Sequence, residues 1–355
     1  MNREAPDAPP ANKPANKPVN KRRSAFFLIL KCIIAAALLW WLSRSGRFDL
    51  RVFSSLRWGW DSAGVLGFQV AMLACMAARW HFLTRALNLN FSFRQTLRIS
   101  LIGFYAAILT PASLGLDGAR LLLSRQLRAG QNREILASVL WDRVLGLWSL
   151  LVLCALCGAV IAFFPVLSSG ETVRRAVLMA SLACGVLALA LAVIFGSPKL
   201  PARIGQMAFL KNKAWLQQAP PRAIFGWPLL LGFATHGCNL LATFFALRIF
   251  ESGAPLFSTL PVAPFVILSS LVPLTPLGLG VTDSTAALLF AAIGVAHGAA
   301  ATMILRATFV LISLIGGLAW LWPNSISETE SVAATEIEPL TTQHSQPEFP
   351  ISSPP

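Results

Sequence analysis

The stretch "LTPASLGLDGARLLL" occupies residues 109–123, and a similar stretch, "LTPLGLGVTDSTAALL", occupies residues 274–289. Each interrupts an apolar segment with a Thr-Pro pair, glycines and an aspartate. Proline lacks a backbone N–H and a run of glycines loosens a helix, so both stretches leave polar backbone groups without helical partners. In lipid, such groups must face protein or a water-filled cavity. Both stretches are therefore predicted to be breaks in membrane-embedded helices.

The composition around these breaks is typical of a membrane protein with several spans. Of the 355 residues, 55% are hydrophobic and 12% are charged, whereas a soluble domain carries about 25% charged residues. The apolar blocks lack the period-two alternation of an outer-membrane barrel. We therefore expect an all-α, polytopic membrane helix bundle in which two Gly/Pro-broken re-entrant segments belong to inverted repeats. The net charge of +14 comes from short basic clusters between apolar blocks, a pattern that favours membrane topology and anionic lipids over nucleic acid.

The chain is expected to consist of one membrane domain between two tails. Residues 1–23 form a basic tail and residues 323–355 a second tail, both predicted to be disordered. The domain itself is predicted over residues 24–322. A retained first span at 24–42 follows Lys21, Arg22 and Arg23, which predicts a cytoplasmic N-terminus in the inner membrane. Further apolar blocks are expected at about residues 61–78, 99–115, 135–164, 176–195, 223–247, 259–281, 284–295 and 299–322.

The two breaks belong to a longer internal repeat, with halves at about residues 61–164 and 223–322. Pro111 of the first break aligns with Pro276 of the second. The likeness continues in "ASVLWDRVLGLWSLL" from Ala137 and "ATMILRATFVLISLI" from Ala301, so that Asp142 and Arg143 align with Arg306 and the residue after it. Chance likeness between two Leu- and Gly-rich strings is the alternative to a true duplication.

The arginine distribution predicts that the copies have opposite orientations. Arg-rich loops are expected at 79–98 and 120–133, on either side of the first break. Both are cytoplasmic only if residues 99–118 enter the membrane and return on the same side. If each following block crosses the membrane once, the second copy then has the opposite orientation in the membrane to the first. The loop at 44–60, which carries four arginines, violates the positive-inside rule in this topology.

Inverted repeats with matching Gly/Pro-interrupted segments indicate a transport site near the middle of the membrane. A Thr-Pro pair suits a helix N-cap followed by proline at the first helical position, and a helix N-terminus suits a phosphate. Charged side chains within apolar runs cost on the order of 3 kcal/mol each at a helix centre. They indicate either structural ion pairs or a polar site whose arginines bind an anionic head group in bidentate fashion. The candidate substrate-binding residues are Thr110, Pro111, Gly115, Asp117, Arg120, Asp142, Arg143, Thr275, Pro276, Gly278, Gly280, Asp283 and Arg306.

Catalytic and metal-binding motifs are absent from the sequence. The loops and tails are much shorter than the roughly 100 residues of a typical soluble domain. No phosphate-binding glycine loop, G-x-S-x-G motif or zinc signature occurs. All six cysteines fall within apolar blocks, where cysteine packs as a small apolar residue. We expect no cofactor, no metal and no enzymatic activity.

Three segments resemble a known family. "LTPASLGLDGARLLLSRQL", "ASVLWDRVLGL" and "LVPLTPLGLGVTDSTAALL" are similar to the flippase-like transmembrane region of lysylphosphatidylglycerol synthases, and the resemblance covers about residues 24–322. It implies that Asp142 and Arg143 correspond to the Asp-Arg pair of the family. The second family motif usually reads Gly-Leu-Gly-Val-Arg-Glu, whereas here Thr282 replaces the arginine and Asp283 the glutamate. The chain is expected to be a stand-alone relative that lacks the soluble aminoacyl-transferase domain.

The resemblance and the repeat together predict a protein that translocates or presents a lipid with an anionic head group. A phospholipid, a polyprenyl phosphate and a hopanoid-related lipid are the candidate substrates, and a separate lipid-modifying enzyme is a candidate partner. A secondary transporter of a small solute is the first alternative, with Asp117 and Asp283 as coupling carboxylates. A non-catalytic subunit of a membrane lipid-modifying enzyme is the second.

Overall fold

The computed structural model describes residues 59–108, 110, 114–164, 171–196, 222–271 and 280–321, and every regular element in these residues is a helix. The predicted tails, the predicted span at 24–42, the loop at 44–60 up to residue 58 and parts of both breaks lie outside the described residues. Within them, the prediction of an all-α fold is confirmed.

The helices form two groups separated by α7 (Glu171–Gly196). The first group is α3 (Trp60–Ala86), α4 (Phe93–Ile108), α5 (Leu114–Leu127) and α6 (Asn132–Phe163). After the short 3₁₀ helix η3 (Arg222–Phe225), the second group is α9 (Trp227–Phe250), α10 (Leu256–Ser269), α11 (Val281–Ala291) and α12 (Gly298–Gly317), followed by η5 (Leu318–Leu321).

Five helical stretches are long and apolar enough to cross a membrane. They correspond to α3, α6, α7, α9 with η3, and α12 with most of η5. A span needs about 20 predominantly apolar residues. Large apolar side chains on α7 are widely exposed, including Met179, Leu182 and Leu189 at 67–71%, and hydrocarbon is the environment that accommodates such a surface. The chain is a multi-pass membrane protein.

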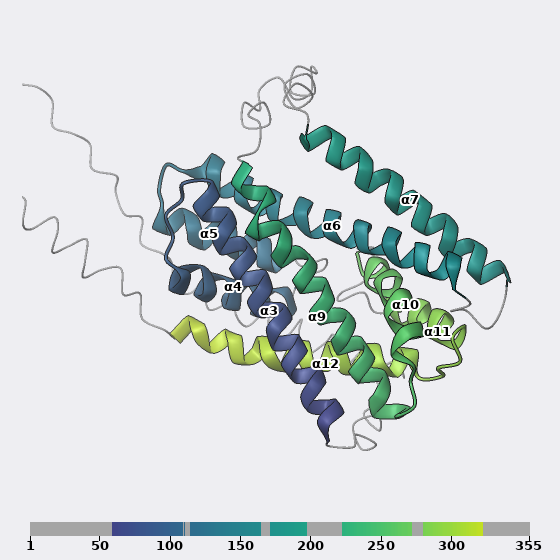
Figure 1. The fold of residues 1–355 in the computed structure, drawn as a ribbon. Helices are drawn as coiled ribbons and strands as arrows, with labels where there is room; N and C mark the ends of the chain where they lie inside the picture. Colours follow the sequence, from purple (N-terminus) through teal and green to yellow (C-terminus); the bar gives the residue numbers. More distant parts are fainter. Residues whose placement is uncertain are drawn as a thin grey trace, which may run out of the picture.

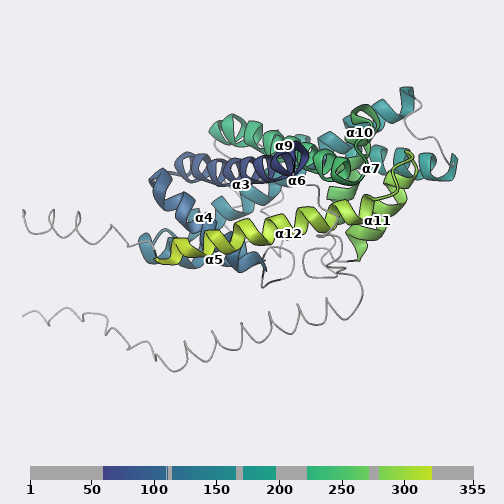
Figure 2. The same cartoon turned by 90° about the horizontal axis from the view of Figure 1, so that it is seen from below.

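The helix order of the first group recurs in the second at a nearly constant spacing. Trp60 and Trp227 begin the first helix of each group, and Asn132 and Gly298 begin the last. Helices α3 and α9 lie side by side and run in opposite directions, and α6 and α12 also run in opposite directions (Figures 1 and 2). An inverted repeat requires this relation between helices, although the repeat itself and its membrane sides stay predictions.

Helices α4 and α5 form a hairpin with the first break at its tip. A Cβ on Gly103 would meet Leu116, and one on Gly115 would meet the backbone of Ala106 and Ala107, so the two helices approach each other closely and are antiparallel. The hairpin is joined to α3 by residues 87–92 and to α6 by residues 128–131. Both of its ends therefore lie at the same end of the bundle.

The connections are much shorter than the sequence predicted. Residues 79–86 continue α3, residues 93–98 begin α4, and residues 120–127 complete α5. The predicted loops at 79–98 and 120–133 are therefore wrong over most of their length. The physical reason is that Arg79 and Arg120 pair with a buried carboxylate, so an arginine here does not mark the end of a span.

Helices α10 and α11 form the corresponding pair in the second group. They follow the end of α9 and precede the start of α12, and the reversed directions of α9 and α12 place the open end of this pair at the opposite end of the bundle (Figure 1). Helix α10 contains two buried prolines, Pro261 and Pro264, whereas α4 has none. The largest apolar core joins α6, α7 and α9–α12 around residues such as Cys154, Phe290 and Ala301.

Candidate functional site

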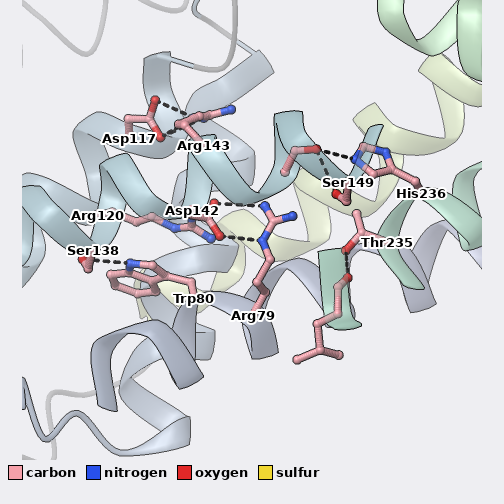
Figure 3. Close-up of polar contacts among 12 residues, drawn as sticks. Arg79, Trp80, Asp117, Arg120, Ser138, Asp142, Arg143, Ser149, Thr235 and His236 are labelled. Atoms are coloured by element: carbon pink, nitrogen blue, oxygen red, sulfur yellow. Dashed lines mark hydrogen bonds and ion pairs between the residues drawn. The ribbon is translucent and has the colours of Figure 1, made fainter. Parts of the chain in front are cut away.

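One face of α6 carries a line of polar groups inside the bundle. Ser138, Asp142, Gly146 and Ser149 recur at intervals of three or four residues, which places them on the same side of a helix. Ser138, Asp142 and Ser149 are at most 1% exposed. The partners of this face come from α3, α5 and α9, as Figure 3 shows. The interior of a membrane protein tolerates such a line only when its groups are paired.

Asp142 pairs with two arginines from two other helices. It accepts hydrogen bonds from Arg79 Nε at 2.7 Å and Arg79 Nη2 at 3.1 Å, a bidentate contact, and from Arg120 Nη1 at 2.7 Å (Figure 3). All three residues are at most 4% exposed. One carboxylate therefore serves two buried cations, and the cluster carries one net positive charge.

Arg120 is the least satisfied member of this cluster. Its side chain has no exposed surface, and its guanidinium lies 4.7 Å from the centre of the Trp80 ring. Trp80 Nε1 in turn donates to Ser138 Oγ at 3.3 Å. Among the described residues, Arg120 Nε and Nη2 have no hydrogen-bond partner. Buried N–H groups without acceptors are costly, and more so on a cation, so these two groups are available to an anionic acceptor as far as the described residues go.

Gly146 allows Arg79 to lie flat across α6. A Cβ at this position would be 3.1 Å from Arg79 Nη1 and 3.3 Å from Nη2. The carbonyl oxygen of Gly146 accepts a hydrogen bond from Ser149 Oγ at 3.0 Å and lies 2.9 Å from His236 Nε2, which must be protonated to donate to it. The polar line thus extends from Asp142 to α9.

A second ion pair lies beside the first. Arg143 donates to Asp117 from Nε to both carboxylate oxygens at 3.0 Å and from Nη2 to Oδ1 at 2.7 Å. The two side chains are 38% and 21% exposed. Because a partly exposed ion pair is unstable against hydrocarbon, this side of α5 and α6 is suited to a polar cavity or to lipid head groups.

In the corresponding place of the second helix group, the part of the chain that the structure describes contains one ion pair, between Asp283 and Arg306. Asp283 accepts hydrogen bonds from Arg306 Nη2 at 3.0 Å, Thr302 Oγ1 at 2.7 Å and the N–H of Gly280 at 2.9 Å. Gly280 has a φ of +86°, which glycine adopts without strain. Asp283 therefore closes the first turn of α11, where a carboxylate also suits the helix dipole.

The structure brings all six predicted charged residues together in pairs. Arg120 meets Asp142, Asp117 meets Arg143, and Asp283 meets Arg306. Pro111, Thr275, Pro276 and Gly278 lie outside the described residues. That the two breaks line one cavity, and that these residues bind substrate, stay predictions.

Thr110 contacts the first turn of α5. Its hydroxyl donates to the carbonyl of Ala106 at 3.2 Å and accepts from the N–H of Gly115 at 2.7 Å. The threonine hydroxyl thus accepts from one N–H in the first turn of α5, which begins at Leu114 among the described residues. Pro111 lies outside the described residues, so its predicted place at the start of a helix stays a prediction.

Sequence reasoning missed four residues that hold the site, namely Arg79, Trp80, His236 and Thr302. The apolar residues after Arg79, in "RWHFL", were the available signal, because a helix that ended at residue 78 would leave them unexplained. Within the described parts of the chain, no group of three or more His, Cys, Asp or Glu side chains is placed to hold a metal ion.

Long apolar helices, two helical hairpins and ion pairs between helices define a multi-pass α-helical membrane protein. A family model described as the lysylphosphatidylglycerol synthase TM region matches residues 28–317. The chain belongs to this family, and the resemblance found in its motifs is confirmed. It is also 23% identical over 324 residues to the UPF0104 membrane protein PH1989 of Pyrococcus horikoshii, across 82% of this chain and 94% of that relative. No solved structure matches the chain.

Proposed function

We propose that the protein translocates or presents a lipid with an anionic head group. The observation that carries the proposal is the buried Arg79–Asp142–Arg120 cluster, in which two cations share one carboxylate and Arg120 keeps two N–H groups without acceptors among the described residues. A phosphate supplies both the missing negative charge and the missing acceptors. The acyl chains need no enclosed site, because the surrounding bilayer already accommodates them.

The paired hairpins supply a route between leaflets. One hairpin opens toward each end of the bundle (Figure 1), and each has an Asp–Arg pair linking its second helix to the next long helix. In transporters built from inverted repeats, one half rocks against the other around a polar site. In this proposal the head group passes between the two halves while its chains stay in lipid.

The proposal places the end formed by the first hairpin in the cytoplasm. Four exposed arginines lie there, and Glu134 is the acidic side chain among the described residues at that end. The arginines are Arg85, Arg94, Arg125 and Arg133. At the opposite end, described carboxylates and arginines are equal in number: Asp61, Glu171 and Glu251 with Arg174, Arg175 and Arg248. The positive-inside rule then assigns the first end to the cytoplasm.

Single cysteines at Ala129 and Ala296, both exposed, test this topology in a cysteine-free background. A membrane-impermeant thiol reagent added to intact cells should label the cysteine at 296 and should label that at 129 only after permeabilisation. Labelling of both from the same side would contradict the inverted-repeat topology.

Transport itself is tested with Arg143→Lys in purified protein reconstituted into vesicles. Lysine keeps the charge but loses the planar fork that binds a carboxylate or phosphate through two N–H groups. Because Arg143 is 38% exposed, we expect normal abundance and melting temperature together with loss of head-group translocation, measured with a fluorescent phosphatidylglycerol and an impermeant quencher. Loss of transport that only follows loss of protein would assign Arg143 a structural role. Absence of translocation by the unaltered protein would refute the proposal.

Small-solute transport is less well supported. Asp117 and Asp283, the carboxylates that would bind a coupling cation, each accept bidentate contacts from an arginine. An arginine already neutralises each carboxylate, which leaves little attraction for a coupling cation. A separate lipid-modifying enzyme as partner stays a prediction.

A further inference from the structure

We propose that the first helix group holds the lipid at rest, and that it selects a head group with a single phosphodiester negative charge, bound by the guanidinium groups of Arg120 and Arg143. This inference rests on the proposed function and specifies the charge class of its substrate.

The charge balance of the ion pairs that link the short helices to the long ones points to this selectivity. Among the described residues, Arg79, Arg120 and Arg143 of the first group face Asp117 and Asp142, which leaves one positive charge in excess in these pairs. In the corresponding pair of the second group, Arg306 faces Asp283, which leaves no excess charge. A buried excess charge is unfavourable until a counter-ion arrives, so an anion gains more free energy in the first group than in the second.

The available donors point to the same place. Arg120 Nε and Nη2 lack partners among the described residues. Asp117 and Arg120 are separated by one helical turn on α5, and their respective partners Arg143 and Asp142 are adjacent on α6. The two ion pairs therefore lie next to each other across the same helix interface (Figure 3). Arg143 is 38% exposed, so in this proposal the head group meets Arg143 first and reaches Arg120 beside it.

The size of the excess charge selects the head group. A phosphodiester carries one negative charge and neutralises the cluster. A phosphomonoester carries about −1.5 to −2 at pH 7 and would leave uncompensated negative charge in a buried site. A zwitterionic head group brings its own cation, which the excess positive charge repels. The favoured class is thus a lipid whose head group is a phosphodiester without an amine.

The second helix group is suited to release. Asp283 already accepts from Arg306, Thr302 and the Gly280 backbone, and the Asp283–Arg306 pair carries no excess charge that an incoming phosphate would neutralise. A head group that reaches this side is held less tightly, so the first group is the resting site.

The experiment measures binding of soluble short-chain lipids to the full-length protein in an uncharged detergent. Dihexanoyl phosphatidylglycerol, phosphatidylcholine and phosphatidate are compared by calorimetric titration at pH 7.5. We expect phosphatidylglycerol to bind about tenfold more tightly than either of the others. At pH 5, where phosphatidate carries close to one negative charge, its disadvantage should shrink. Equal affinities, or tighter binding of phosphatidate at pH 7.5, would overturn the inference.

Arg120→Gln tests the assigned donor, with Arg175→Gln as the matched control. Arg175 is an exposed arginine that pairs with Glu171 on α7, and α7 contributes no residue to the cluster. We expect Arg120→Gln to lose the preference for phosphatidylglycerol and Arg175→Gln to keep it. A folded Arg120→Gln protein that retains the preference would contradict the assignment. If this variant does not fold, the ranking of the three lipids on the unaltered protein still decides.

Separate measurements of binding and of translocation distinguish a failure of this inference from a failure of the proposed function. Translocation of fluorescent lipids without head-group selectivity would leave the proposed function standing and refute the inference. Selective binding of phosphatidylglycerol without translocation would support the inference and refute the proposed function.

Discussion

The two helix groups share an order of elements but satisfy their buried charges differently. Both place an aspartate in the first or second turn of the short helix after the break and an arginine on the next long helix: Asp117 with Arg143, and Asp283 with Arg306. In the second group the carboxylate gains a hydroxyl and a backbone N–H as further donors. In the first, two more arginines compete for one additional carboxylate. The same order of helices therefore holds one carboxylate with three donors, one of them an arginine, in the second group, and more arginines than carboxylates in the first group.

The two arginines of the additional cluster have no charged counterpart in the second group. When the two halves are aligned so that Pro111 matches Pro276, the positions of Arg79 and Arg120 correspond to Phe244 and Thr285. Phe244 is buried and contacts the neighbouring Phe245 edge to face. The second group therefore has apolar packing at the position where the first group has a buried ionic cluster. We expect the two halves to differ in function at this position.

Removing the shared carboxylate should have the largest effect. Asp142→Asn leaves Arg79 and Arg120 buried without an anion, and breaking a buried pair costs about 3–5 kcal/mol. We expect a strong loss of folded protein, measured by fluorescence-detected size-exclusion chromatography and thermal unfolding in detergent. The double variant Asp142→Asn/Arg120→Met is expected to recover part of the loss, because it removes one of the stranded cations. Unchanged stability of the single variant would show that the cluster is hydrated and not buried.

Filling the tip of the first hairpin should come next. Gly115→Leu places a side chain against the backbone of Ala106 and Ala107, and overpacking of this kind costs about 3 kcal/mol. The matched control is Gly118→Leu on the same helix, where no neighbouring atom lies within 4 Å of the new Cβ. Thermal unfolding of the two variants should differ clearly. Equal melting temperatures would mean that α4 and α5 are not closely packed.

The equivalent loss of charge in the second group should be smaller. Asp283→Asn leaves one arginine without an anion, at a site where both side chains are 12% exposed, and the asparagine oxygen still accepts one hydrogen bond. Loss of a hydrogen bond to a charged group costs about 2 kcal/mol. Thermal unfolding measured beside Asp142→Asn gives the difference between the groups. A larger effect for Asp283→Asn would reverse the proposed asymmetry.

The smallest effect concerns Glu251, outside the spans, which accepts hydrogen bonds at one oxygen from the N–H of Ala296, the N–H of His297 and, at 2.7 Å, from His297 Nδ1. Partial burial alone would raise the pKa of Glu251, but these hydrogen bonds outweigh burial and lower it. A lowered pKa in the folded state adds stability that is complete above the usual glutamate range and is lost as the pH falls through the lowered value.

Glu251→Gln should therefore lower the melting temperature slightly at neutral pH, by less than about 1 kcal/mol in free energy, and the difference should close in acid. Melting curves of both proteins from pH 7 downward check this. A difference that grows toward acid would give the opposite sign and contradict the assignment. A difference that stays constant would show that the charge of Glu251 contributes nothing.

The sequence predicted the helical class, because that depends on local composition, and the described helices end at Ile108 and Ser269 and begin again at Leu114 and Val281, beside the predicted breaks. It also identified Asp142, Arg143 and Arg306, because a charge within an apolar run is visible without a structure. Arg79 was assigned to a loop, because sequence alone does not show that a carboxylate 63 residues away satisfies it. His236 and Thr302 were missed for the same reason, since their roles arise only where helices meet.

The two prolines of α10 are expected to make the halves differ in stiffness. Pro261 and Pro264 each remove the N–H that would bond to the carbonyl four residues earlier, whereas α4 contains no proline from Phe93 to Ile108. The loss of two backbone hydrogen bonds makes a helix of this length easier to bend. We therefore expect α10 to bend more readily than α4 under the same load, so that a change in bilayer thickness would deform the second hairpin before the first.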